Sequence, residues 1–145
     1  MKILIGVDGS PHSKAALDYV KTMTWPKGTQ VVVLSVSIPM VAYTVVDAAG
    51  LTWMQTAEEE MSTQAQELTA RVEQELRDAG FATEARVVKG DPREALVDAA
   101  RTLHADLVVV GSHGRTGLAK LVLGSVANHV VTHAPCSVLV VKMTK

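Results

Sequence analysis

The sequence predicts a single doubly wound α/β domain over residues 1–145, in which helices cover both faces of a five-stranded parallel sheet. Three observations support this fold class: short aliphatic runs recur along the chain, helical patterns separate them, and a length of 145 residues suits one domain. Strands that alternate with helices imply right-handed crossovers, and such crossovers build a parallel sheet that is covered on both sides.

Five runs rich in valine, isoleucine and leucine are the expected strands. Four of them are almost continuously apolar, as strands buried on both faces are, whereas the third alternates like an edge strand. In chain order they are residues 2–7, 30–36, 82–88, 105–111 and 136–142. Ligands of doubly wound sheets bind beyond the carboxyl ends of the strands, so a site is expected after Val7, Val36, Val88 or Val110.

The first and third helices begin with capping signals. Ser10 and Pro11 are typical of a helix start, and Asp91 and Pro92 repeat the arrangement with Glu94 at the capping-box position. The first helix is expected to bury Ala16, Val20 and Met23, and the third to bury Leu96, Ala99, Ala100 and Leu103.

The second helix has the clearest amphipathic pattern in the chain. Its apolar residues repeat every three or four positions, at Ala57, Met61, Ala65, Leu68, Val72, Leu76 and Ala79. The segment before it, residues 37–53, is long for a loop in a compact domain and is expected to be functional, mobile or partly helical. Trp53 and Met54 have no assigned burial, so contact with a ligand or a second subunit is expected for them.

Composition and charge limit the classes of function. Hydrophobic residues make up 48% and charged residues 20% of the chain, as in compact soluble proteins. A net charge of -1 gives no excess positive field for nucleic acid, and no apolar run suits a membrane span, so neither partner is expected. The single cysteine, Cys136, and a start without a signal segment predict a cytoplasmic location.

Residues 111–125 carry the strongest functional pattern. Glycines stand at 111, 114, 117 and 124, and Ser125 follows where a fourth helix is expected to begin and to bury Val126, Ala127, Val130 and Val131. Glycines let backbone amides converge on an anion, and the first amides of a helix attract negative charge. Alternatively, the glycines only shape a turn and let the last helix pack closely. Neither the P-loop nor the dinucleotide signature is present.

The spacing of these glycines resembles the ATP-binding pattern of the universal stress protein family. In that pattern two residues separate Gly111 from Gly114, and nine more precede Gly124 and Ser125. Further segments look like family segments: KILIGVDGSPHSKAAL at the start, VKGDPREALVDAARTLHADLVVVGSHGRTGL in the middle and GSVANHVVTHAPCSVLVVK near the end. The resemblance covers nearly the whole chain, and only residues 39–56 contain no motif that aligns.

The resemblance implies an ATP molecule over the carboxyl ends of the first and fourth strands. By carry-over, Gly111, Gly114, Gly124 and Ser125 hold the phosphates and ribose. Val7 and Asp8 flank the nucleoside, and Val36 meets the adenine through its backbone. The wall of the site is completed by Val110, Ser112, His113, Arg115 and Val126. A carboxylate at the position of Asp8 also suits ribose hydroxyls or a metal ion, Mg²⁺ or Mn²⁺ bound with the nucleotide, and its alternative role is that of a turn residue.

Three functional classes stay open at this stage. The first is a stress-response module that changes with bound ATP and needs no catalytic residue, which the resemblance favours. The second is a slow ATPase that uses a bound metal, with Asp8 and His113 as contributors. The third is a structural dimer independent of nucleotide. The resemblance also implies a homodimer formed through the last strand, from Ser137 to Lys142, whose aliphatic content suits burial.

Other reactive residues receive structural interpretations. His129 and His133 have the spacing of a two-histidine metal site, but no acidic or cysteine ligand accompanies them in the sequence, which favours a surface or subunit contact. Cys136 follows a proline at a strand start and is expected to pack in the interior. Ser10 and Ser125 lie outside a nucleophile elbow, so acyl-enzyme chemistry is not expected. His113 has no evident orienting partner for general-base catalysis.

Overall fold

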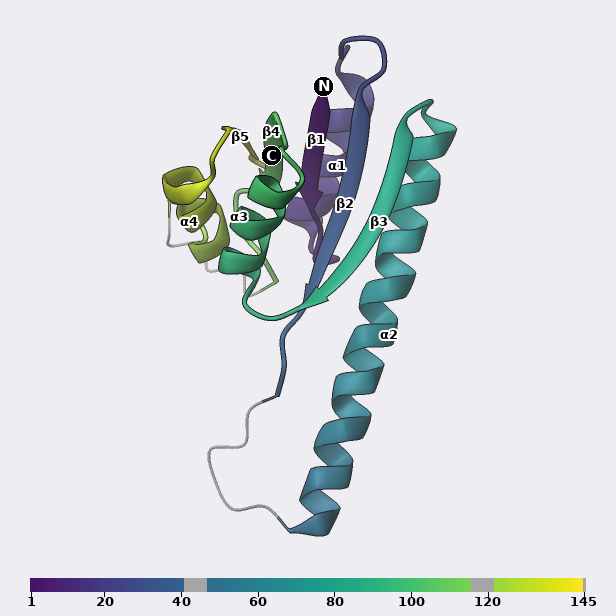
Figure 1. The fold of residues 1–145 in the computed structure, drawn as a ribbon, viewed down its shortest axis with the longest axis vertical. Coiled ribbons are helices and arrows are strands. Elements are labelled where there is room, and N and C mark those ends of the chain that lie inside the picture. The colour runs from purple at the N-terminus through teal and green to yellow at the C-terminus, as the bar shows by residue number, and fades with distance from the viewer. Residues whose placement is uncertain (41–46, 116–121, 145) are drawn as a thin grey trace.

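The computed structural model describes residues 1–40, 47–115 and 122–144, which form a single α/β domain. Five strands and four helices alternate in this part of the chain (Figure 1). They are β1 (Lys2–Gly6), α1 (Pro11–Thr22), β2 (Gln30–Ser37), α2 (Ala48–Asp78), β3 (Ala82–Lys89), α3 (Pro92–Thr102), β4 (Leu107–Gly111), α4 (Ser125–His133) and β5 (Ser137–Val141).

All five strands are parallel and lie in the order β3-β2-β1-β4-β5, which confirms the predicted doubly wound sheet. The chain winds outward from β1 to β3, returns to the centre, and continues outward through β4 and β5. Its direction therefore reverses between β1 and β4, where Ile3 pairs with Leu107 and Ile5 with Val109. In a sheet of this kind, ligands bind at the carboxyl end of that reversal.

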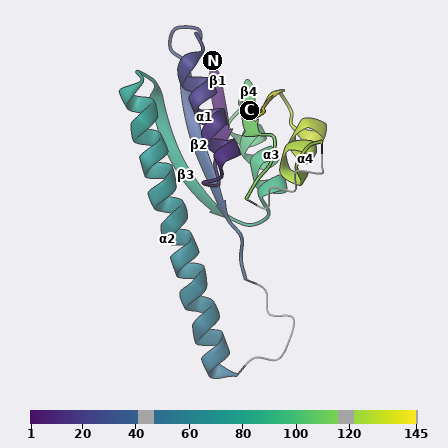
Figure 2. The same cartoon turned by 180° about the vertical axis from the view of Figure 1, so that it is seen from behind.

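Two helices cover each face of the sheet (Figures 1 and 2). Ile3 and Ile5 of β1 point toward α1 and α2, whereas Leu4 points toward α3 and α4, because successive side chains of a strand alternate between faces. All three side chains are completely buried. The apolar runs of the central strands thus supply two separate cores, one on each side of the sheet. The third strand lies at an edge, as its alternating pattern predicts.

The helix starts agree with the capping signals, with one correction. Ser10 accepts a hydrogen bond from the Ser13 amide at 3.2 Å, and Asp91 accepts one from the Arg93 amide at 2.9 Å. In a capping box the Asp91 side chain would accept the amide of Glu94, and the Glu94 side chain would accept the amide of Asp91. Here Asp91 accepts the amide of Arg93, one residue earlier, and the Glu94 carboxylate lies 3.1 Å from His129 of α4. The capping-box prediction is therefore wrong, because the Glu94 side chain of α3 contacts α4 instead of its own helix start.

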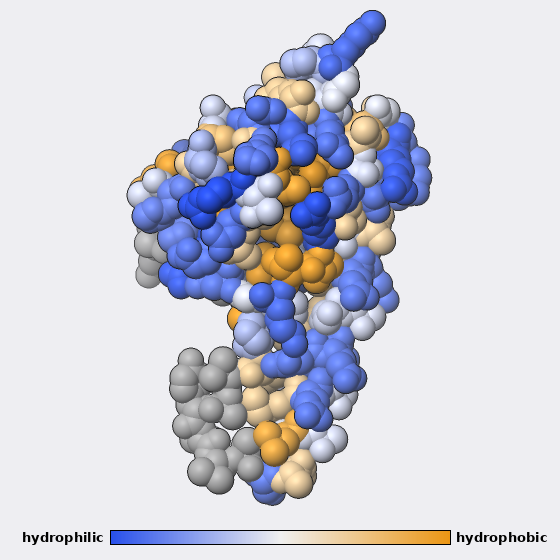
Figure 3. Space-filling model, viewed as in Figure 1, coloured by the Kyte–Doolittle hydropathy of each residue, from blue (hydrophilic) through white to orange (hydrophobic). Residues whose placement is uncertain are grey.

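Helix α2 begins earlier than its apolar stripe. Asp47 caps it by accepting the Gly50 amide at 2.8 Å, so the predicted irregular segment is helical from Ala48 onward, and residues 41–46 lie outside the described part. The first turns project beyond the sheet as an arm (Figure 1), and apolar surface is visible at this end of the molecule (Figure 3). Leu51 is 50% and Trp53 is 65% exposed. No helix among the described residues has the length and apolar character that a membrane span requires.

Three residues of the predicted stripes are exposed rather than buried. Met23 follows the last turn of α1 in an extended conformation, and Ala79 is the final cap of α2, so both lie past the edge of the core. Val131 occupies the outer face of α4, one position round the helix from the buried Val130. In α2 the fully buried part of the stripe begins only at Ala65, because the preceding turns extend beyond the sheet.

Ion pairs join α1 to α2 across one face of the domain. Glu75 accepts hydrogen bonds from Lys21 at 3.0 Å and from Lys14 at 3.1 Å, and Lys14 also contacts Asp18 at 3.0 Å. The bond from Lys21, supported by Lys14, lowers the pKa of the Glu75 carboxyl, although partial burial opposes the change. The carboxylates of Asp18 and Glu75 raise the pKa of Lys14 in turn.

We expect this ion pairing to make stability depend on pH. A carboxyl with a lowered pKa in the folded state stabilises the fold above its unfolded pKa of about 4.5, and loses that contribution as the pH falls through the folded value. Glu75→Gln should therefore be less stable than the parent at pH 7 in urea denaturation, and the difference should shrink as the pH falls below about 4.5. Glu67→Gln, at an exposed position of the same helix, is the matched control. A difference for Glu75→Gln that is constant with pH would contradict this account.

Candidate functional site

The two segments of the predicted site meet at the reversal between β1 and β4. The Val7 amide donates to the Leu34 carbonyl at 2.9 Å, which extends β1 by one residue and places Asp8 at the rim. On the neighbouring strand, the Ser112 amide donates to the Val141 carbonyl at 2.9 Å and extends β4 in the same way. Because the strands are parallel, both extensions end on the same edge of the sheet.

Asp8 uses its two carboxylate oxygens differently. Its Oδ1 accepts the Ser10 amide at 2.9 Å, which is the turn role expected as the alternative. Its Oδ2 faces the glycine segment, since a β-carbon built on Gly114 would lie 3.1 Å from this atom. The backbone carbonyl of Asp8 also accepts a hydrogen bond from Nε of Arg115. Asp8 therefore stabilises the turn after β1 and also directs one oxygen toward the loop after β4.

Gly111 is required by packing. A β-carbon at this position would lie 2.7 Å from the backbone carbon and oxygen of His12, in the first turn of α1. Real β-carbons do not approach other atoms this closely, so the end of β4 and the start of α1 approach each other only because residue 111 has no side chain. For this glycine, close packing is a sufficient reason.

Gly124 closes the loop onto α4. Its amide donates to the Ser112 carbonyl at 2.7 Å, and a β-carbon here would lie 3.0 Å from Cα of His113. Packing thus also accounts for Gly124. Gly114 differs from both, because its missing β-carbon would meet only the Asp8 carboxylate. Of these three glycines, Gly114 is the one whose side-chain space opens toward a polar group.

The backbone amides at the start of α4 are candidate donors to an anion. Gly124 is the N-cap of this helix, and no side chain of the described residues accepts a hydrogen bond at the cap. Ser125 is exposed and Val126 is half-buried against the core. The first amides of a helix have no internal acceptor and carry partial positive charge, so this terminus can receive an anion beside Gly114 and Asp8.

A histidine that sequence reasoning missed lies at the same edge. The Ser112 side chain is only 3% exposed, and its Oγ lies 3.1 Å from Nδ1 of His113 and 3.4 Å from Nδ1 of His12. The two imidazole rings are 5.1 Å apart. His113 therefore has an orienting neighbour, contrary to the sequence-based expectation. The sequence could have indicated His12, because this residue lies in the first turn of a helix that starts beside Asp8.

The remaining wall residues occupy different depths. Val110 is buried within β4, Val36 is half-buried near the end of β2, and Arg115 is exposed at the rim. A hollow of about 230 Å³ borders Val7 on the side of α1 and α2, where Leu68 lies in its wall. Gly117 and Lys120, which stand between Gly114 and Gly124 in the sequence, lie outside the described residues.

The other reactive residues have structural surroundings. The rings of His129 and His133 are tilted against each other with centroids 4.3 Å apart, and Glu94 contacts His129, so an acidic neighbour exists that the sequence did not reveal. Among the described residues no group of three or more histidine, cysteine, aspartate or glutamate side chains is arranged to hold a metal. Burial raises the pKa of the Cys136 thiol, with a smaller effect from Asp106, which keeps the thiol protonated and favours packing over reactivity.

The profile described as "Universal stress protein family" matches residues 1–142. With the doubly wound sheet and the glycine loop at its reversal, this match shows that the chain belongs to the universal stress protein family. The sequence is similar to universal stress protein MJ0577 of Methanocaldococcus jannaschii, with 30% identity over 152 aligned positions that cover 97% of this chain and 94% of that protein.

Further comparisons agree with this assignment. Universal stress protein Sll1388 of Synechocystis is 42% identical over 84 residues, which are 58% of this chain and only 54% of that protein. The solved structure of MJ0577 superposes with a TM-score of 0.87 at 29% identity, and covers 99% of this chain and 96% of its own. A universal stress protein in complex with cAMP gives a TM-score of 0.72 at 26% identity, with 99% and 98% covered.

Because Gly111 is fixed by packing and Gly114 has an open side, we expect different results when each is replaced by alanine. Gly111→Ala should lower the free energy of unfolding by about 1–3 kcal/mol, because the methyl group meets the His12 backbone. Gly114→Ala should change it by less than about 1 kcal/mol, since the Asp8 side chain can rotate away. Urea denaturation of both variants measures the difference. Equal destabilisation would mean that Gly114 is also fixed by packing.

Proposed function

We propose that residues 1–145 form an ATP-binding domain that acts in the stress response as a nucleotide-responsive module. The observation that carries the proposal is the meeting of Asp8 Oδ2, the open side of Gly114 and the start of α4 at the reversal between β1 and β4, where no described side chain caps the helix. Membership of the universal stress protein family and the likeness to a relative in complex with cAMP support nucleotide as the ligand.

Each group in the proposed site has a chemical task. Backbone amides at Gly114 and Ser125 donate to the phosphates, Gly124 brings the start of α4 beside Gly114, and the dipole of α4 favours the phosphate charge. Asp8 accepts ribose hydroxyls, and the backbone of Val36 meets the adenine. Gly111 brings β4 close to α1, while the enclosing wall consists of Val7, Val110, Ser112, His113, Arg115 and Val126.

The residues present also fit a divalent cation that arrives with ATP. Mg²⁺ and Mn²⁺ prefer oxygen ligands, and Mg²⁺ commonly takes one or two carboxylates together with phosphate oxygens and water. Asp8 Oδ2 is the carboxylate oxygen of this edge that faces Gly114. A cation held there offsets phosphate charge. We propose no other protein ligand for the cation.

Slow ATP hydrolysis is a second candidate function. The specific observation in its favour is the contact of His113 with the nearly buried Ser112 hydroxyl, which orients an imidazole beside the proposed phosphate position. Binding without turnover needs none of this chemistry, and it stays our main proposal. The single half-buried thiol, Cys136, also suits a reducing compartment, so we propose a cytoplasmic location.

Nucleotide binding can be tested on the intact protein. Mass spectrometry of small molecules released from freshly purified, denatured protein should detect an adenine nucleotide, and calorimetric titration should show ATP binding. Gly114→Ala should weaken ATP binding about tenfold, because the methyl group displaces a donor–phosphate contact. Gly28→Asn, a glycine variant at the opposite end of the sheet, should bind normally. Absence of released nucleotide together with no ATP binding at millimolar concentration would refute the proposal.

We further propose that two chains pair through β5. This strand is at the edge of the sheet, where its outer backbone groups have no strand partner among the described residues, and Val138, Leu139 and Val140 are only half-buried. An unprotected aliphatic edge is a template for pairing with a second copy. The paired segment would extend from Ser137 to Lys142.

Light scattering at micromolar concentration tests this pairing. We expect a mass of twice 15.4 kDa for the parent chain. Leu139→Glu should shift the protein toward the monomer, because a carboxylate is costly to bury in an interface, and circular dichroism would verify that the variant folds. Val131→Glu, on the exposed face of α4, should leave the mass unchanged. A monomeric parent chain would contradict the proposed dimer.

A further inference from the structure

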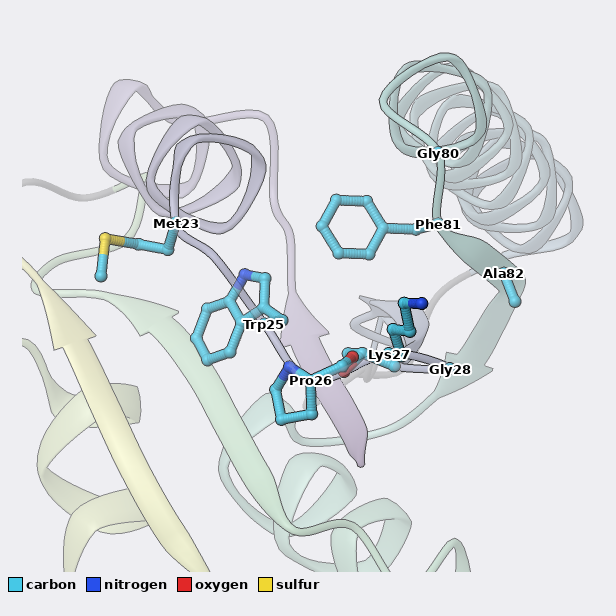
Figure 4. Close-up of a pocket in the computed structure, with 9 residues that line it drawn as sticks. Met23, Trp25, Pro26, Lys27, Gly28, Gly80, Phe81 and Ala82 are labelled. Carbon is cyan, nitrogen blue, oxygen red and sulfur yellow. The ribbon is translucent and has the colours of Figure 1, made fainter.

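A larger hollow lies at the other end of the sheet, among the amino ends of the strands (Figure 4). The end of α1, the turn before β2 and the start of β3 line an open hollow with a volume of about 430 Å³. That volume is within the range of roughly 300–1,000 Å³ that is usual for small-molecule sites. The proposed nucleotide site is at the carboxyl ends, so the two locations are separated by the length of the sheet.

Aromatic side chains are concentrated in this hollow. The chain is poor in aromatic residues, with one phenylalanine, two tryptophans and two tyrosines. Its single phenylalanine, Phe81, and one of the tryptophans, Trp25, both line the hollow, and Figure 4 shows their rings between α1 and the start of β3. Two aromatic rings from segments more than fifty residues apart thus lie in one small space.

The rings are held in place without being fully covered. Trp25 Nε1 donates to the Val20 carbonyl at 2.8 Å, which fixes the indole against the end of α1. Trp25 and Phe81 both pack on the core between α1 and α2, yet both stay half-buried. Fixed aromatic rings with exposed area offer stacking surface at little cost in conformational entropy.

Turn glycines keep the space beside the rings open. Gly28 and Gly80 have φ values of +78° and +94°, which favour glycine, and a β-carbon on either would meet no other atom within 4 Å. The hollow therefore has free space beside the turns at Gly28 and Gly80.

One positive charge lies at the hollow. Lys27 is the only ionisable residue of the described lining, it is exposed, and it makes no ion pair within the described part of the chain. The acidic groups at the end of α2 have other partners: Glu73 pairs with Arg77 at 2.7 Å, and Asp78 accepts from Gln74 at 2.8 Å. An unpaired cation beside apolar rings favours a ligand that carries negative charge.

We propose that this hollow is a second ligand site, which takes a small, flat aromatic molecule with a single anionic group. The ring system of the ligand stacks on Trp25 and Phe81, and its anionic group faces Lys27. This site is independent of the proposed nucleotide site, because the two share no residue and lie at opposite ends of the strands.

The test uses 8-anilinonaphthalene-1-sulfonate as the probe and the full chain with Trp53→Phe, which leaves Trp25 as the sole tryptophan. We expect saturable binding of one probe per chain, with quenching of Trp25 and energy transfer from it to the probe. Lys27→Glu should weaken binding about tenfold, because it replaces attraction with repulsion at short range. Arg101→Glu on α3, with the same change of net charge, should have no effect.

Two further measurements distinguish binding in this hollow from probe uptake by loosely packed chains and from binding at the nucleotide site. Phe81→Leu should weaken probe binding, because the stacking surface is lost. The variant should still unfold cooperatively in urea, which excludes probe uptake by a loosely packed state. Saturating ATP should leave probe binding unchanged, so the result does not depend on whether the nucleotide proposal holds. Displacement by ATP, absence of Trp25 quenching, or equal affinity of the parent and Lys27→Glu would each overturn the second site.

Discussion

The parallel pairing of β1 with β4 is the constraint on which the site depends. These strands are separated by about a hundred residues of chain, and their pairing puts Asp8 and the glycine loop on one edge of the sheet. Parallel strands end on the same side, so each later strand adds its own loop to that edge. The reversal of winding between β1 and β4 also keeps the crossover helices apart, on opposite faces, and leaves the carboxyl edge between them accessible.

Backbone proximity links folding to ligand binding in the loop after β4. Gly111 permits contact with α1, and Gly124 permits contact with Ser112 and His113. These two contacts fix both ends of the loop, so Gly114 faces Asp8 beside the start of α4 in a defined arrangement. Packing and anion binding are thus compatible roles within one glycine pattern. Two glycines build the loop, and that construction leaves the third open toward the proposed ligand.

The two ends of the sheet differ in chemistry. The carboxyl end presents backbone amides, a carboxylate and two imidazoles, which suit a polar, phosphorylated ligand. At the amino end, Trp25 and Phe81 form an aromatic surface beside a lysine, in a protein that otherwise fills its cores with aliphatic side chains. Helix α2 extends past the carboxyl end, where its arm exposes Trp53 and Leu51. Each region is thereby suited to a different kind of contact.

The sequence by itself determined the strands, the order of the elements and most helix starts. Those features are local: apolar runs specify buried strands, and Ser10 with Pro11 satisfies the first turn of a helix wherever it packs. The family pattern also identified the glycine loop. Local patterns were less reliable at the ends of helices, where Met23 and Ala79 continue an apolar stripe past the edge of the core.

Only the tertiary structure decided which distant groups meet. His12 approaches Ser112, Glu94 turns to His129, and Trp25 lies near Phe81 because the sheet and its helices place them there. The distinction between Gly111, Gly114 and Gly124 likewise depends on what surrounds each missing side chain. The physical reason is that helix and strand patterns report each residue's relation to its own element, whereas contacts and free space depend on how separate elements pack.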